Sequence, residues 1–360
     1  MRGLRTPLVV AALFLGLGVL LAWLAEGGPR APRAPEPEFP RRLREPELAR
    51  LSERRTLAVP GAAEAGGEAP AAVDPFLAAL TRDPAEPLLV LEANALRHSR
   101  IGELFVECLA RGRGERNPID EVRREAGIDP LKDVDRVAFS HRGVVVSGFF
   151  QRARLERVEA EARVARRGAD GRVYAPRAPE EGGIALGTWR RDLVVVGETG
   201  FVEETLDRLA HPDPEVRPVL PEHLTYGEAY GVVPGSALQG LFRGDQAELG
   251  RRLAAVASRI EIHADAMRDV AVVARVTGED ADGLDDLGKA FGAALAVGRL
   301  QAAARGDGTL AELLEHARVA RGGPGFSLEL ALPVEVVERW FEGCGEAAVL
   351  PGADAPAPPP

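Results

Sequence analysis

From residue 88 onward, apolar positions alternate between the two-residue spacing of strands and the three-to-four-residue spacing of helices. The first apolar run predicts a short strand over 88–93. A helix over 101–110, with its apolar residues on one face, and a more polar helix near 118–126 follow. The elements predicted next are hairpin strands 134–140 and 144–150, a charged helix 151–167, hairpin strands 184–189 and 193–197, and a helix 200–210.

The second half of the chain shows a similar order of apolar patterns. Its predicted elements are a strand 226–233, helices near 237–243 and 245–257, hairpin strands 260–264 and 270–277, helices 281–304 and 310–318, hairpin strands 317–321 and 326–332, and a last helix that begins at Pro333. A strand, helices, a hairpin, a helix, a second hairpin and a closing helix therefore occur twice in the same order.

This repetition predicts an α+β protein made of two similar modules, 73–210 and 211–344. Hairpins make neighbouring strands antiparallel, so each module is predicted to be a largely antiparallel sheet of about five strands with helices packed on one face. The alternative is that an α+β chain alternates such elements without any duplication. Residue identity between the halves is too low to decide between the two.

A separate apolar segment lies near the start of the chain, over 7–25, and contains nineteen residues without a charge. As a helix it would span about 28 Å, close to the hydrocarbon thickness of a bilayer. Arg2 and Arg5 precede it, which favours a short cytoplasmic tail over 1–6. The sequence thus predicts an uncleaved signal-anchor, a single-pass helix in the cell inner membrane with the rest of the chain extracytoplasmic, in the periplasm.

The alternative for this segment is a cleaved signal peptide. The apolar run is longer than such peptides normally have, and the best cleavage motif, Ala25-Glu26-Gly27, is followed by Gly28 and Pro29. A mature N-terminus near residue 28, measured by mass spectrometry, would establish cleavage. With either outcome, the bulk of the chain is predicted to be extracytoplasmic.

Two low-complexity segments flank the predicted modules. Residues 26–72 are rich in Pro, Ala, Gly and Arg, and residues 345–360 are mostly Ala and Pro. Such compositions bury too little apolar surface to offset the entropy of ordering. Both segments are predicted to be disordered, the first as a linker between the membrane and the modules. Just after the linker, Asp74 and Pro75 predict the N-cap and first residue of a short helix.

Composition and charge exclude some functions. The chain of 360 residues has a formal net charge of −10, which argues against a nucleic-acid partner because such proteins need a basic face. Sequence patterns of phosphate-binding loops, zinc-binding HExxH helices, GxSxG elbows and SxxK nucleophiles are all missing. The sequence therefore assigns no catalytic, cofactor-binding or metal-ligating residue.

Two polar groups are candidate metal sites because imidazole and carboxylates bind divalent cations. Glu261, His263, Asp265 and Asp269 lie on and around a predicted hairpin turn. The other group holds five carboxylates just before and within the start of the predicted helix 281–304: Glu279, Asp280, Asp282, Asp285 and Asp286. A polar hairpin edge and an acidic helix N-terminus, which complements the helix dipole, explain both groups without a metal.

Two further features leave alternatives open. The predicted helix 151–167 carries six arginines and three glutamates around Leu155 and Val158, which suits either a solvated face or contact with anionic lipid. Cys108 and Cys344 are the only cysteines, and an exported protein could join them in a disulfide if their Cα atoms lie within about 7 Å. The position of Cys108 on an apolar helix face also suits a reduced core residue.

The predicted function is a non-catalytic binding or envelope-assembly role for a membrane-anchored extracytoplasmic protein. The anchor, the linker and the missing catalytic patterns motivate it. One alternative is a periplasmic carrier of an apolar ligand, which requires a cavity of several hundred Å³. Another is an enzyme whose active-site residues are dispersed along the sequence.

Overall fold

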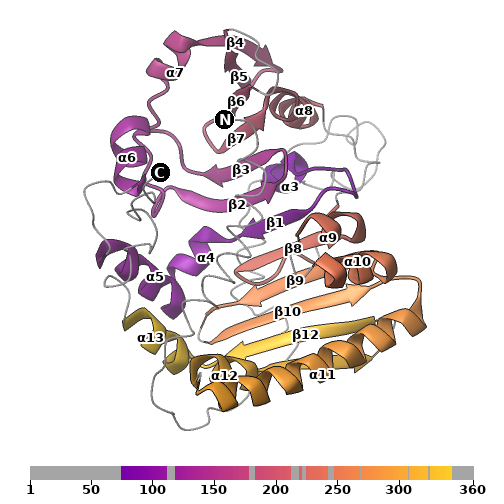
Figure 1. The fold of residues 1–360 in the computed structure, drawn as a ribbon. Coiled ribbons are helices and arrows are strands. Elements are labelled where there is room, and N and C mark those ends of the chain that lie inside the picture. Colours follow the sequence, from indigo (N-terminus) through magenta and orange to yellow (C-terminus); the bar gives the residue numbers. More distant parts are fainter. Residues whose placement is uncertain are drawn as a thin grey trace, which may run out of the picture.

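The computed structural model places the folded part of the chain in an α+β architecture built on one large antiparallel sheet (Figure 1). It describes residues 74–111, 118–177, 183–211, 219–220, 224–241, 247–267, 269–306, 308–322 and 325–342. The predicted tail 1–6, anchor 7–25, linker 26–72 and C-terminal tail 345–360 lie outside the described residues. Among the helices that are described, none has the length and apolar character needed to cross a bilayer.

The N-terminal half contributes seven strands. These are β1 (Leu88–Leu91), β2 (Val134–Ser140), β3 (Gly143–Gly148), β4 (Ala162–Arg167), β5 (Gly171–Pro176), β6 (Ile184–Trp189) and β7 (Leu193–Glu198). Its helices are α3 (Pro75–Ala79), α4 (Ala93–Arg97), α5 (Arg100–Arg111), α6 (Pro118–Ala126), α7 (Glu156–Glu161) and α8 (Thr199–Ala210).

The C-terminal half contributes five strands. These are β8 (Ala229–Pro234), β9 (Arg259–Asp265), β10 (Val270–Thr277), β11 (Ala317–Gly322) and β12 (Gly325–Leu332). Its helices are α9 (Gly235–Leu241), α10 (Ala247–Val256), α11 (Ala281–Arg305), α12 (Gly308–Glu315) and α13 (Val334–Glu342). The 25-residue α11 runs along the lower part of the molecule in Figure 1.

The twelve strands of the described residues belong to a single sheet in the order β11-β12-β10-β9-β8-β1-β2-β3-β7-β6-β5-β4. The two halves meet where β1 pairs antiparallel with β8, with Val90 opposite Tyr230. The predicted antiparallel, hairpin-rich sheet is therefore present, but one continuous sheet replaces the two that the sequence predicts. The β1–β8 pairing joins strands far apart in sequence, which no local pattern reveals.

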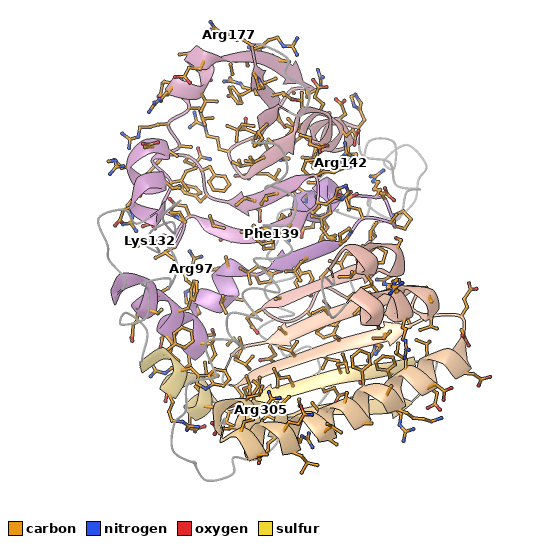
Figure 2. The ribbon with its side chains drawn as sticks, in the orientation of Figure 1. Arg97, Lys132, Phe139, Arg142, Arg177 and Arg305 are labelled. Atoms are coloured by element: carbon orange, nitrogen blue, oxygen red, sulfur yellow. The ribbon has the colours of Figure 1, made fainter. Side chains whose placement is uncertain are left out.

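Helices of the two halves bury different parts of this sheet. In the N-terminal half, α3 and α8 pack over a cluster that includes Val90, Val145 and Val195. In the C-terminal half, α9, α10 and α11 pack over a cluster that includes Val276 and Phe326. Arg142, in the turn between β2 and β3, pairs with Glu204 of α8 at 2.8 Å and so lowers the pKa of that carboxyl (Figure 2).

Strand register shows that these two packed surfaces lie on opposite faces. Val90 lies opposite Tyr230, and Tyr230 lies opposite His263. His263 in turn lies opposite Val273. Opposed residues share a face, whereas residues an odd number of positions apart on one strand do not. Val276 therefore points away from the side of Val90, so α3 and α8 of one half and α9 to α11 of the other pack on opposite faces of the continuous sheet. The sequence predicts one helical face for each module, but not how the two faces are related.

The charged segment 151–167 differs most from its prediction. Only Glu156–Glu161 is helical, as α7, and 162–167 is the edge strand β4, paired with the unpredicted strand β5. Arginine, glutamate and alanine are strong helix formers, so local propensity favours a helix through the whole segment. Pairing with β5, after a turn in which Gly168 takes a left-handed φ of 61°, overrides that preference.

A third cluster of buried residues lies beside the end of β12. Helices α5, α12 and α13 contribute to it through Leu104, Leu313 and Trp340. Cys108, also on α5, is disulfide-bonded, and the chain has one other cysteine, Cys344, outside the described residues. The bonded state of Cys108 replaces the reduced core cysteine that its apolar surroundings also suit.

The fold is tied at its first described residue by a nearly buried ion pair. Arg136 on β2 binds both carboxylate oxygens of Asp74 at 2.5 and 3.0 Å. Asp74 also caps α3 by accepting a hydrogen bond from the backbone N–H of Phe76, and the Arg136 guanidinium lies 4.3 Å from the centre of the Phe76 ring. The predicted N-cap Asp74, followed by Pro75 as the first helical residue, is confirmed.

Candidate functional site

A cavity of about 600 Å³ lies between the N-terminal half of the sheet and a segment that crosses over it. We call residues 149–159, which lead into and through the start of α7, the strap. The strap lines the cavity together with β5, β6 and β7, on the sheet face opposite the one covered by α8, and Figure 1 shows α7 beside β4. The volume is within the range of small-molecule sites, about 300 to 1,000 Å³.

The floor of the cavity is formed by alternate residues of three neighbouring strands. Tyr174 on β5 lies opposite Leu186 on β6, and Thr188 on β6 lies opposite Val194 on β7. All four line the cavity. Their neighbours on the other face, such as Val173 and Val195, belong to the core under α8, so the two-residue period of the strands separates core from cavity.

The strap supplies an apolar roof. Phe150, Leu155 and Val158 all line the cavity. The backbone N–H of Phe150 donates to the carbonyl oxygen of Arg191 at 2.9 Å, and the N–H of Arg154 donates to that of Ala126 at 2.8 Å. The strap is thus hydrogen-bonded to the turn between β6 and β7 and to the end of α6.

Two arginines fix the ends of this region through neutral oxygens. Nη2 of Arg154 donates to the carbonyl oxygen of Arg124 at 2.6 Å, where a cation complements the C-terminal end of α6. Nη2 of Arg177, labelled in Figure 2 at the far end of β5, donates to the carbonyl oxygen of Ala160 in α7 at 2.7 Å.

Charged groups surround the apolar lining. The lining contains five arginines and four carboxylates: Arg154, Arg157, Arg172, Arg190, Arg191, Glu125, Glu156, Glu159 and Asp170. Arg172 pairs with Glu159 at 3.4 Å, and Arg190 pairs with Asp170 at 2.9 Å. Arg191 instead donates to the backbone and side-chain oxygens of Gln151, at 3.5 and 3.3 Å, and both of these acceptors are neutral.

Arg190 has an unusual backbone conformation. Its φ is 53°, which makes it the one non-glycine residue with positive φ in the described part of the chain. Left-handed backbone is disfavoured for a residue with a Cβ, and turns that need it usually contain Gly or Asn. The backbone N–H of Arg190 donates to the carbonyl oxygen of Asp170 at 2.9 Å, which joins the two hairpin turns at this end of the cavity.

The predicted polar group near the β9–β10 turn has a structural explanation. His263 is 7% exposed and stacks on Tyr226, with ring centroids 3.9 Å apart and an interplanar angle of 4°. Burial lowers the pKa of His263 to about 4. Glu261 pairs with Arg259 at 3.3 Å, and Asp269 accepts from the backbone N–H of Val334 at 3.2 Å.

Acidic residues around the start of α11 also bind protein groups, as Asp280 and Asp285 show. Asp280 caps the helix by accepting from the backbone N–H of Gly283 at 2.9 Å. Asp285 pairs with Lys289 at 2.7 Å, and this hydrogen bond lowers the pKa of Asp285. Within the residues that the structure describes, His, Cys, Asp and Glu side chains form no group of three suited to a metal ion.

The sequence marks some residues of the cavity lining as apolar positions, but nothing in it indicates that they enclose a cavity. Leu155 and Val158 stand out as apolar positions in the charged segment 151–167, and the structure turns them into the roof. Asp170 and Arg190 are missed because their turns come together only when β5 pairs with β6. The turn between β6 and β7 itself follows from the predicted hairpin strands 184–189 and 193–197, but no local motif marks Arg190 as a residue of the cavity.

Comparison with known proteins adds little. No known protein family and no curated protein matches the sequence. Among solved structures, crystal form I of TP0453 is similar over 76% of this chain and 99% of its own, with 11% identity and a TM-score of 0.40. Crystal form IV of TP0453 is similar over 75% and 96%, with 12% identity and a TM-score of 0.42. A likeness at this level carries no argument about function.

Proposed function

We propose that this protein is a non-catalytic extracytoplasmic binding protein that holds an apolar molecule between its sheet and its strap. The observation that carries the proposal is the cavity of about 600 Å³, with Leu186 and Val194 in its floor and Phe150, Leu155 and Val158 in its roof. Leu186 and Val194 of the floor and Leu155 and Val158 of the roof line the same space. Enclosing an apolar ligand there removes its surface from water, at about 25 cal/mol per Å².

The groups around the cavity favour binding over chemistry. They are arginines, carboxylates, a threonine and a tyrosine, and three of the arginines are paired with carboxylates. The hydroxyl of Tyr174 donates to Glu159 at 3.3 Å rather than to a basic nitrogen. No histidine or cysteine is among the residues that line the described cavity, so the usual pairing of a nucleophile with a base has no counterpart there.

The proposal places this binding protein at the cell inner membrane. The support is the uncharged apolar run over 7–25, with Arg2 and Arg5 before it and a proline-rich segment after it. A single-pass anchor and a linker would hold the binding module in the periplasm, close to the membrane surface. An apolar ligand that leaves or enters a bilayer would then meet the cavity at short range.

We further propose that the two halves are copies of one module. Outward from the β1–β8 pair, the C-terminal half runs β8-β9-β10-β12-β11 and the N-terminal half runs β1-β2-β3-β7-β6-β5-β4. Both orders end with a hairpin whose first strand, β4 or β11, is the edge strand and whose second strand, β5 or β12, lies inside it, and the N-terminal half has one more hairpin. The outermost strands both contain the sequence Ala-Arg-Val-Ala-Arg, at 162–166 and 317–321.

A photo-crosslinking experiment on the full chain in lipid nanodiscs tests the binding proposal. The probe is a neutral, diazirine-bearing dodecanol, and the cross-linked peptides are identified by mass spectrometry. We expect cross-links in 150–159 and 172–194. Leu186→Glu places a carboxylate in the apolar floor and should lower this labelling at least tenfold, because burying a charge beside an alkyl chain is costly.

The matched control is Ile184→Glu. Ile184 is on the same strand and the same face as Leu186, is 51% exposed, and is not among the residues that line the cavity. Its labelling should stay within about twofold of the unmodified protein. The cavity would be rejected as the binding site if neither 150–159 nor 172–194 were labelled in the unmodified protein. It would also be rejected if Leu186→Glu and Ile184→Glu were labelled equally at unchanged melting temperature.

A further inference from the structure

We propose that the molecule held in the cavity is an amphiphile with an anionic head group, and that Arg190 and Arg191 bind that head. This inference rests on the proposed function, since it names the class of ligand for the same cavity. The body of the ligand would lie between Leu186, Val194 and the strap, and its head at the turn between β6 and β7.

The lining of the cavity as a whole carries slightly more positive than negative charge. Five arginines and four carboxylates line the cavity, which gives the lining a formal charge of +1 in a chain of net charge −10. Arg191 carries a guanidinium whose acceptors within the described structure are two neutral oxygens of Gln151, at 3.5 and 3.3 Å. A carboxylate or phosphate is a stronger acceptor for that guanidinium than an amide.

The backbone of Arg190 is the second, independent observation. The residue keeps a side chain in a left-handed conformation where glycine would fit without strain. Residues held in such conformations cluster at functional sites. Its guanidinium pairs with Asp170, but both side chains are largely exposed, at 48% and 39%, so this ion pair stabilises the fold little. Stability therefore gives no reason for an arginine at this position.

Backbone hydrogen bonds also hold the turn that carries Arg190 and Arg191 in place. The backbone of Arg190 is hydrogen-bonded to Asp170, and that of Arg191 to Phe150 of the strap. The two guanidiniums therefore extend from a turn that is joined both to the neighbouring hairpin and to the roof. A head group bound there would bridge the floor and the strap at one end of the cavity.

Competition against the diazirine-bearing dodecanol, again with the full chain in nanodiscs, tests the ligand class. The competitors are dodecanoate, dodecyl phosphate, dodecanol and dodecyltrimethylammonium, so the two anionic arms separate a carboxylate from a phosphate. At low ionic strength we expect the better anion to compete at about tenfold lower concentration than dodecanol, and the cation to compete worst. Added salt should reduce the advantage.

Two variants examine the arginines separately. Arg191→Gln should remove most of the anion's advantage and leave competition by dodecanol unchanged. Arg190→Gly should also weaken the anion while its melting temperature stays the same or rises by about 2 to 4 °C, because glycine relieves the left-handed backbone. A purely structural arginine would not lose affinity while the fold becomes more stable.

Arg163→Gln is the matched control. Arg163 is an exposed arginine on β4 that pairs with the core residue Ala175, so both residues lie on the sheet face away from the cavity. This variant removes one positive charge but should keep the full preference for the anion. Equal competition by dodecanol and both anions, with the cavity still labelled, would overturn the anionic ligand and leave the proposed function intact. Loss of labelling in the unmodified protein would reject both.

Discussion

At the scale of single residues, His263 shows how burial changes a group that the sequence marks as chemical. It lies on β9, opposite Tyr230 on one side and Val273 on the other. Its ring stacks on Tyr226, and Nδ1 lies 3.5 Å from the carbonyl oxygen of that residue. Burial keeps the ring neutral by lowering its pKa to about 4, so it acts as a packed aromatic ring.

This burial predicts a pH dependence of folding stability. The pKa of His263 is about 4 in the fold and about 6.5 when unfolded, so the unfolded chain binds more protons between these values. The contribution of the neutral His263 ring to folding stability is fully present above pH 6.5 and is lost as the pH falls toward 4. Its size is up to about 3 kcal/mol, measurable as a fall in the free energy of unfolding in denaturant titrations.

His263→Phe provides the comparison for this prediction. Phenylalanine keeps an aromatic ring against Tyr226 but cannot take up a proton, so its stability should change less between pH 6.5 and pH 4. Protonation of carboxylates in ion pairs also lowers folding stability as the pH falls, but this loss is the same in the unmodified chain and in His263→Phe. A variant that loses as much stability as the unmodified chain over this range would show that His263 is not the group responsible.

At the scale of elements, helix α5 and the last helix α13 depend on each other. Both contribute to the cluster beside the end of β12, through Leu104 on α5 and Trp340 on α13. Arg100 of α5 also pairs with Glu338 of α13 at 2.7 Å. Cys108 near the end of α5 is in a disulfide, and Cys344 is the other cysteine of the chain.

We therefore expect reduction to loosen the last helix. A disulfide that links distant parts of a chain typically contributes about 2 to 4 kcal/mol. Cys108→Ser should lower the melting temperature and increase hydrogen exchange in α13, while peptides from β4 to β7 change little at low temperature. Non-reducing peptide mapping should find 108 and 344 in one linked fragment.

The reducing agent supplies the control for this experiment. The Cys108→Ser variant should show no further loss of stability in the presence of dithiothreitol, whereas the unmodified protein should fall to a similar level. If the reductant destabilises both proteins equally, a contribution other than the disulfide accounts for the difference.

At the scale of the whole molecule, the pairing of β1 with β8 joins the two halves into one continuous sheet. β1 is only four residues long, yet it pairs with β2 on one side and with β8 on the other. Val90 in its middle has 0% exposure and packs in the core of the N-terminal half. Loss of β1 would expose the edges of both halves at once.

This arrangement predicts a single unfolding transition. Val90→Ala leaves a cavity next to the β1–β8 pair and should cost about 2 kcal/mol. Hydrogen exchange measured by mass spectrometry should accelerate by a similar factor in β7 and in β12, on both sides of the junction. Val122→Ala, the same substitution at a residue of α6 that is 41% exposed, should leave exchange in both strands unchanged. Acceleration confined to β7 would mean that the halves unfold separately.

The sequence by itself determines most elements and the α+β class. Apolar periodicity locates α5, α6, α8, α11 and both strands of the β2–β3 and β6–β7 hairpins within a few residues, because these patterns arise from local burial. It fails at 162–167, where helix-forming residues are held in a strand by a partner the local pattern does not contain. The identical edge sequences at 162–166 and 317–321 are a signal for this strand that periodicity alone overlooks.

Only the tertiary structure decides that the sheet is continuous and where the cavity lies. The β1–β8 pairing, the opposite-face packing of the helices and the meeting of the turns at Asp170 and Arg190 all join residues distant in sequence. The space between the strap and the sheet stays open because hydrogen bonds at Phe150 and Arg154 hold the strap above the sheet. Apolar periodicity shows which side of a helix or strand is buried, but not which other element covers that side. The position of a binding site depends on which elements come together, and so only the tertiary structure reveals it.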